Sequence, residues 1–276
     1  MFVREDIVRI ERFCGQLAGA IYNSSLLEQV RNEGNRANKL LLNILPEQVA
    51  EELKQKGVVE PVYYQSVSVI FTDFKGFTKI AEKMDIHTLI GELDICFYQF
   101  DEITLRNKVE KIKTIGDSYM CVAGLPERNY THAIDACFVA LEIQKLMKVM
   151  KEAKVNINMP YWELRLGIHT GPVVAGVVGK HKFAYDIWGD TVNTASRMES
   201  SGMAGCINIS QNTYQEIKYF FETEYRGKIK PKNKEELDMY FLNRLKKQYS
   251  NDEEGHIPNE KFKEIYKKIK QGVKII

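Results

Sequence analysis

The chain has 276 residues, of which 44% are hydrophobic and 28% charged, and its formal net charge is +2. This composition is that of a globular protein, and the length allows one catalytic domain with extensions. The near-neutral charge argues against a nucleic-acid-binding protein, because such proteins carry a clear basic stripe.

The five cysteines are scattered along the chain without a Cys-x-x-Cys pair. This pattern argues against a disulfide framework and against a zinc site. No apolar run approaches the roughly 20 residues that cross a bilayer, and the N-terminus lacks a signal-peptide pattern. We therefore expect a cytoplasmic protein, and leave open a membrane segment upstream of this chain.

Residues 1–58 are predicted to form a signalling helix and a linker. Apolar residues recur every three or four positions over residues 7–44, with one change of phase. This pattern favours a parallel, dimeric coiled coil over an amphipathic helix that packs on its own domain. Pro46 suits the first turn of a second helix over residues 47–54, which Gly57 ends.

The segment after this linker is predicted to be a buried strand that ends on a carboxylate. Residues 67–71 are mostly β-branched or aromatic, Asp73 follows them, and Gly76 allows a turn into a helix that starts near Phe77. A carboxylate oxygen binds a hard cation, and the free N–H groups of a helix N-terminus face an anion. An aspartate that merely caps the turn explains this segment equally well.

The following elements alternate between helices and strands. They are a helical region over 77–105 with a break near Asp85, strands over 109–115 and 118–124, a helix over 130–151, and strands over 163–170 and 173–178. Gly116-Asp117 is predicted to be a two-residue hairpin turn, and Gly171-Pro172 a turn between the last two strands. The order strand–helix–strand–strand–helix–strand is the ferredoxin-like pattern of an α+β fold.

This pattern brings Asp73 and Asp117 to one edge of the sheet. No lysine or arginine is obviously tied to either residue, so the two carboxylates would repel each other unless they share divalent cations. Further along, Asp190 is a good N-cap for a helix that ends before Gly202. Asn193 and Arg197 share a face of that helix, where they could bind a sugar and a phosphate or form an ordinary surface pair.

Three motifs make a resemblance specific. They are FTDFKGFT at 71–78, KTIGD at 113–117 and YDIWGDTVNTASR at 185–197. Over about residues 62–243 the chain resembles class III nucleotidyl cyclase catalytic domains. Residues 41–46 resemble the linker that often precedes these domains, and residues 2–29 resemble the closing helix of a GAF domain.

The resemblance implies a division of the chain into three parts. Residues 1–58 are the signalling helix or coiled coil with its linker, residues 59–245 the catalytic domain with its ferredoxin-like βαββαβ core, and residues 246–276 a charged tail. The resemblance of residues 2–29 to a GAF helix implies that the chain begins inside a larger protein whose upstream sensor domain is missing.

The resemblance further assigns the metal ligands. It implies that Asp73 and Asp117 hold two divalent cations per site, Mg²⁺ or Mn²⁺, and that the backbone carbonyl of Phe74 adds a ligand. Lys232 stands at the spacing of the lysine that holds the terminal phosphates. Its neighbours, Pro231 and Asn233, depart from the family pattern.

It also assigns the residues that contact the nucleoside. Lys113 and Asp186 match the pair that reads the purine. Asn193 matches the residue that orients the ribose, and Arg197 matches the arginine that stabilises charge on the reacting phosphate. The family works as a dimer with active sites at the subunit interface. Because this chain carries both halves of such a site, the resemblance implies a symmetric homodimer.

The chemistry of the purine-reading pair predicts the substrate. Adenine offers an acceptor at N1 and a donor at its amine, whereas Lys113 only donates and ionised Asp186 only accepts. Guanine reverses both demands, and two mismatches imply discrimination on the order of a hundredfold or more. We therefore expect an adenylyl cyclase that makes 3′,5′-cyclic AMP and pyrophosphate. The alternatives are a guanylyl cyclase and a catalytically silent nucleotide-binding or dimerisation module.

Overall fold

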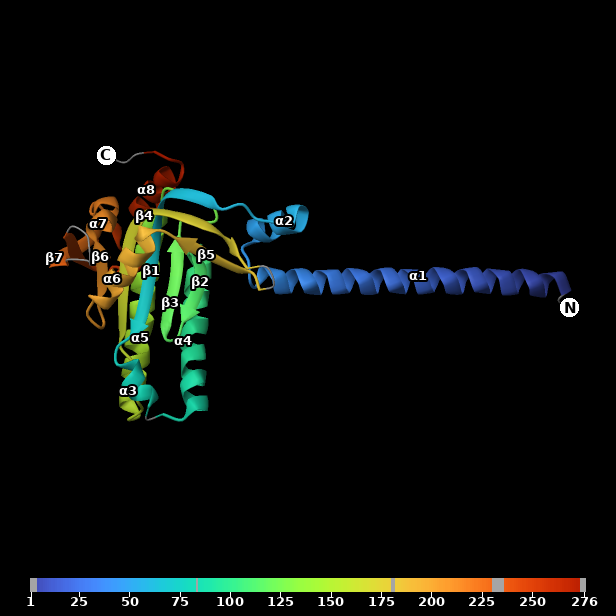
Figure 1. Cartoon of the computed structure of the whole chain (residues 1–276), viewed down its shortest axis with the longest axis horizontal. Coiled ribbons are helices and arrows are strands. Elements are labelled where there is room, and N and C mark those ends of the chain that lie inside the picture. The colour runs from blue at the N-terminus through green and yellow to red at the C-terminus, as the bar shows by residue number, and fades with distance from the viewer. Residues whose placement is uncertain (1–3, 83, 180–181, 230–235, 274–276) are drawn as a thin grey trace. The chain divides into compact units, whose positions relative to one another are not determined.

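The computed structural model describes the chain except residues 1–3, 83, 180–181, 230–235 and 274–276 (Figure 1). The chain divides into two compact units, residues 1–58 and residues 59–276. Each unit is described by itself below.

The first unit consists of two helices, as predicted. Helix α1 spans Arg4–Leu42 and helix α2 spans Glu47–Lys56, directly after Pro46. Gly57 ends α2 with a left-handed φ of 72°, and its N–H donates to the carbonyl of Leu53 at 2.8 Å. Most large apolar side chains along α1 are exposed, between 39% for Leu42 and 72% for Leu27. The coiled coil stays a prediction.

The second unit is built on an eight-stranded sheet. The strands are β1 (Val62–Phe74), β2 (Glu110–Ile115), β3 (Ser118–Ala123), β4 (Leu164–Val178), β5 (Ala184–Trp188), β6 (Ile207–Ser210), β7 (Phe221–Ile229) and β8 (Leu237–Leu245). Their order is β2-β3-β1-β4-β6-β8-β7, and β5 pairs with β4 outside this path. The part β2-β3-β1-β4, with its crossover helices, confirms the predicted ferredoxin-like core.

Helices connect and cover these strands. They are α3 (Phe77–Ala81), α4 (Ile86–Arg106), α5 (His132–Asn156), α6 (Asp190–Ser200), α7 (Gln211–Ile217), the 3₁₀ helix η1 (Lys247–Tyr249) and α8 (Glu260–Lys270). The predicted break near Asp85 is confirmed, since the Asp85 carboxylate caps α4 by accepting from the N–H of Thr88 at 3.0 Å. No helix among the described residues is long and apolar enough to span a membrane.

The predicted turn at Gly171-Pro172 is wrong, because β4 runs through both residues as one continuous strand. Pro172 has no N–H to donate, but it lies opposite a bulge, where the register between β1 and β4 shifts between Tyr64 and Val67. The other neighbours of β4 do not reach it, since β6 pairs with residues 166–168 and β5 with residues 174–178. A proline at a bulge leaves the strand intact.

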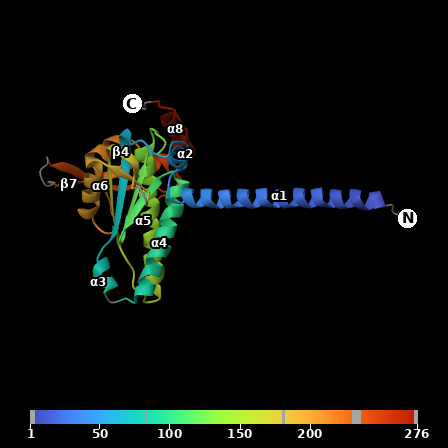
Figure 2. The same ribbon diagram turned by 45° about the vertical axis from the view of Figure 1, so that its right-hand side comes forward.

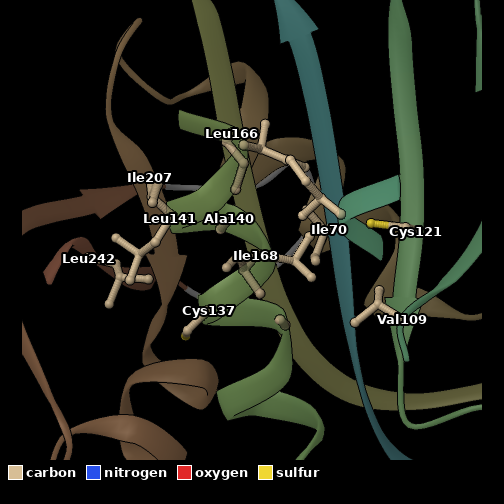
Figure 3. Packing of buried hydrophobic residues seen from close by; sticks show 14 of the residues in the cluster. Ile70, Val109, Cys121, Cys137, Ala140, Leu141, Leu166, Ile168, Ile207 and Leu242 are labelled. Atoms are coloured by element: carbon tan, nitrogen blue, oxygen red, sulfur yellow. The ribbon is translucent and has the colours of Figure 1, made fainter. Parts of the chain in front are cut away.

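Strand register determines which side chains face the helices. Ile70 is paired with Cys121 on β3 and with Ile168 on β4, and these side chains pack against Ala140 and its neighbours on α5 (Figure 3). Because side chains alternate along a strand, Phe71 and Asp73 lie on the opposite face of β1. That face is where α6 lies, so the sheet stands between α6 and the pair α4 and α5 (Figure 2).

The C-terminal helix α8 packs on this unit. Asn259 caps it by accepting from the N–H of Phe262 at 3.0 Å, and Phe262 is only 2% exposed. The Phe262 ring contacts Phe138 of α5 and Phe220 with centroid separations of 5.6 and 5.8 Å. The aromatic cluster shows that this helix, within the predicted charged tail, is packed on the domain.

Replacing Phe262 with alanine is therefore expected to lower the free energy of unfolding by about 3–4 kcal/mol, because the change leaves a cavity among aromatic rings. Urea denaturation followed by circular dichroism measures this loss. Ile257→Ala, at a side chain that is 55% exposed, serves as the control and should cost less than about 0.5 kcal/mol. A Phe262→Ala loss as small as that of the control would contradict the packing.

Candidate active site

Two of the predicted metal ligands lie together at one edge of the sheet, where β1 ends and β2 turns into β3. Asp73 is the penultimate residue of β1, and Asp117 lies in the two-residue turn that joins Ile115 to Ser118, as predicted. Gly116 takes a φ of 62° in this turn. Burial raises the pKa of Asp117, and the negative charge of Asp73 raises it further. The two carboxylates are therefore close enough to repel each other.

Arg165 corrects the expectation that no basic residue is tied to this pair. Its Nη2 donates to Oδ2 of Asp73, so the two side chains form an ion pair. The cause is the register of the sheet, in which Asp73 of β1 is paired with Arg165 of β4. Reasoning along the chain missed this contact because the two residues are 92 positions apart, and no local signal gives the pairing of two distant strands.

The donor chemistry of this edge fits a hard divalent cation. Two carboxylates that repel each other, next to the backbone of Phe74, supply the oxygen ligands that Mg²⁺ and Mn²⁺ prefer. The described residues include no group of three or more His, Cys, Asp or Glu side chains that could hold a metal ion.

The predicted purine-reading pair is also brought together. Nζ of Lys113, on β2, donates to Oδ2 of Asp186, on β5, at 2.5 Å. The other carboxylate oxygen of Asp186 accepts from the N–H of Ile187 at 2.9 Å, which fixes the orientation of the carboxylate. The Lys113 side chain remains 40% exposed and that of Asp186 18% exposed. The pair therefore offers one donor and one acceptor, side by side, to the solvent.

Helix α6 carries Asn193 and Arg197, which share one of its faces. Asn193 is exposed, and Nη1 of Arg197 is buried without a hydrogen-bond partner among the described residues. The predicted N-cap at Asp190 is wrong by one position. Gly189 is the cap residue, with a φ of 143°, and Asp190 is the first helical residue. Lys232 lies outside the described residues.

Glu110 is the first residue of β2 and carries an unusual carboxylate. Burial raises its pKa to about 7, and within the described part of the chain it makes no hydrogen bond or ion pair. The pKa of Glu110 in the folded state exceeds its unfolded value of about 4.3. Between about pH 4 and pH 7, Glu110 therefore keeps its proton in the folded state and loses it in the unfolded state. Stability should therefore fall as the pH rises from about 4 to 7.

Glu110→Gln removes this loss. We expect the variant to equal the wild type in unfolding free energy near pH 4 and to exceed it by about 3 kcal/mol near pH 8. Chemical denaturation at the two pH values measures the difference. Glu102→Gln, at an exposed position of α4, should show no such dependence. An equal effect of Glu110→Gln at both pH values would contradict the raised pKa.

Comparison with known proteins adds to this geometry. The family described as "Adenylate and Guanylate cyclase catalytic domain" matches residues 59–244. The chain is 40% identical to human "Guanylyl cyclase C" over 223 residues, which are 79% of this chain and 21% of that protein. It is 39% identical to an "Adenylate cyclase" of Mycobacterium bovis over 212 residues, which are 76% of this chain and 47% of that protein.

A solved structure extends the comparison. The catalytic core of a rhodopsin-guanylyl cyclase with converted specificity, in complex with ATPαS, matches with a TM-score of 0.62 and 39% identity. The match covers 66% of this chain and 97% of that core. The chain thus spans about a fifth to a half of the curated relatives, and these relatives carry the names of both purine specificities.

Proposed function

Because this chain belongs to the family of the adenylate and guanylate cyclase catalytic domain, we propose that it converts ATP to 3′,5′-cyclic AMP and pyrophosphate. The preference for ATP rests on one observation, the ion pair between Lys113 and Asp186. An ammonium group can donate to N1 of adenine, and a carboxylate can accept from its amine. Guanine places a donor against Lys113 and an acceptor against Asp186, so both contacts would be lost.

The metal half of the proposed site consists of Asp73, Asp117 and the backbone carbonyl of Phe74. A divalent cation there, two per site in our proposal, supplies the positive charge that lowers the pKa of the ribose 3′-hydroxyl and neutralises the triphosphate. Asp73 and Asp117 hold this charge at the edge of the sheet. The Arg165 guanidinium beside them balances the two carboxylates before substrate arrives.

Two residues of α6 act on the rest of the nucleotide. Arg197 has a buried, unpartnered Nη1 among the described residues, so it can donate to the reacting phosphate without losing an existing bond. This contact stabilises the negative charge that develops during the attack. Asn193 presents its amide on the same face and orients the ribose. Lys232 holds the terminal phosphates in this proposal.

The proposal places the site in a homodimer. Lys113 is 40% exposed in the single chain, and a purine edge bound there would compete with water. Hydrogen-bond selectivity is strongest where water is excluded. A second copy of the chain can cover the pair and bring its own metal half to the same nucleotide, which gives two equivalent composite sites.

The experiment that tests the function measures product from ATP and from GTP, with Mn²⁺ and then Mg²⁺, over a range of protein concentrations. We expect cyclic AMP, with a kcat/KM for ATP at least about a hundredfold above that for GTP. A preference for GTP would establish the guanylyl cyclase alternative. Nucleotide binding without any product, at all concentrations, would establish the silent module.

A further inference from the structure

Arg165 bridges two carboxylates, of which only one belongs to the candidate site. Its Nη2 donates to Oδ2 of Asp73, and its Nε lies 3.0 Å from Oε1 of Glu199 on α6. Glu199 is only 6% exposed. The guanidinium therefore connects a predicted metal ligand to a buried acid that no motif identified.

The backbone of the fold creates this bridge. Arg165 and Gly167 lie on the same face of β4, two residues apart. A Cβ at Gly167 would lie 2.0 Å from the backbone nitrogen of Glu199, so α6 can approach this closely only because residue 167 is glycine. This close approach fixes Glu199 beside Arg165. The helix and the strand thus hold the acid and the guanidinium in one place.

The contact with Glu199 is incomplete. Oε1 of Glu199 and Nε of Arg165 are both buried, and neither makes a well-aligned hydrogen bond to any part of the chain that the structure describes. A buried carboxylate with spare acceptor capacity is costly unless a cation is nearby. Burial accordingly raises the pKa of Glu199 to about 7, and the charge of Arg165 opposes this rise. Glu199 can therefore accept more from Arg165 than it now does.

Arg165 and a metal ion would compete for Oδ2 of Asp73. Oδ2 of Asp73 accepts from Nη2 of Arg165, and a cation that binds this oxygen repels the positive guanidinium. A divalent cation that takes this oxygen at the Asp73–Asp117 pair then moves Arg165 off it. The free energy of this exchange depends on where the guanidinium goes, and Glu199 is the adjacent acceptor.

We propose that Glu199 is a positioning residue that holds Arg165 when a divalent cation takes the Asp73 oxygen. The inference rests on the metal half of the proposed function. With Glu199 present, Arg165 exchanges one carboxylate for the other and stays at the edge of the metal site. Without that acid, Arg165 binds Asp73 alone and competes with the cation more strongly.

The test measures Mn²⁺ binding to the whole chain without nucleotide, from the electron paramagnetic resonance signal of free Mn²⁺. We expect Glu199→Gln to weaken Mn²⁺ binding about tenfold, which corresponds to about 1.4 kcal/mol. Arg165→Gln should bind Mn²⁺ at least as tightly as the wild type, since the competitor is gone. In the Arg165→Gln background, Glu199→Gln should change the affinity less than about twofold.

This double-mutant cycle tests whether Glu199 acts through its contact with Arg165 or only through its own negative charge. Equal weakening by Glu199→Gln in both backgrounds would show that Glu199 acts only through its own negative charge, and would overturn the proposal. No weakening in the wild-type background would overturn it as well. The melting temperature of each variant checks folding. If Glu199→Gln fails to fold, Arg165→Lys replaces it, because one ammonium group cannot bridge both acids and should weaken Mn²⁺ binding in the same way.

The outcomes also distinguish this inference from the proposed function. A wild-type chain that binds Mn²⁺ and follows the cycle but forms no cyclic nucleotide would refute the function and leave the role of Glu199 standing. A wild-type chain that forms cyclic AMP while Glu199→Gln leaves Mn²⁺ affinity unchanged would refute the inference alone. A wild-type chain that binds no Mn²⁺ without nucleotide would refute the inference, and the product assay alone would then decide the function.

Discussion

Replacing Asp73 with asparagine is expected to reduce cyclic nucleotide formation at least about a thousandfold. The change removes one of the two carboxylates that hold the proposed cations, and an amide is a far weaker ligand for a hard cation. It also frees Arg165 to pair with Glu199, so the single chain should keep its fold. Initial rates with saturating Mn²⁺ and ATP measure the loss.

The control for this variant is Asp94→Asn, which makes the same change at an exposed position of α4. It should keep more than about half of the wild-type rate. Melting temperatures of both variants establish that the folded chain is being compared. If Asp73→Asn retained more than a tenth of the activity, the metal role of this edge would be excluded.

Exchanging the polarity of the proposed purine-reading pair, Lys113 and Asp186, is expected to reverse the substrate preference. In Lys113→Glu/Asp186→Ser, the glutamate accepts from N1–H of guanine and the serine hydroxyl donates to O6. Two contacts are lost for ATP and two are gained for GTP. The ratio of kcat/KM for ATP over GTP should therefore fall at least about a thousandfold.

The ratio is the useful measurement, because it does not depend on how much of the variant is folded. Lys111→Glu provides the control, since it makes the same substitution as Lys113→Glu two residues away, where Lys111 pairs with Asp101 at 2.8 Å. That variant should leave the ratio unchanged within about twofold. A loss of activity with both nucleotides and no change in their ratio would mean that the pair supports the fold and does not read the base.

The sequence was sufficient for features that depend on neighbouring residues. Asp73 at a strand end, Asp117 in a two-residue turn and Gly57 at a helix end each follow from local propensity, and the structure has all three. The contact between Lys113 and Asp186 came from a family resemblance, because 73 positions separate them. No propensity argument brings such residues together.

The features that the sequence did not predict depend on pairing between distant strands. Arg165 meets Asp73 because of the β1–β4 register, and Glu199 reaches Arg165 because α6 lies directly on Gly167. The error at Pro172 has the same origin. A proline breaks a strand only if a neighbouring strand needs its N–H, and the position of the bulge in β1 decides that.

Among the strands that the structure describes, β5 lies outside the main path of the sheet and pairs only with β4. Asp186 on this strand and the half-exposed Lys113 are therefore surrounded by little of the core, whereas Asp73 and Arg165 lie on two central strands. Under the proposed roles, mutations of Lys113 and Asp186, which select the purine, would disturb packing far less than mutations of Asp73 and Arg165, which lie at the metal site. Natural selection would then find a new nucleotide more easily than a new reaction on this architecture.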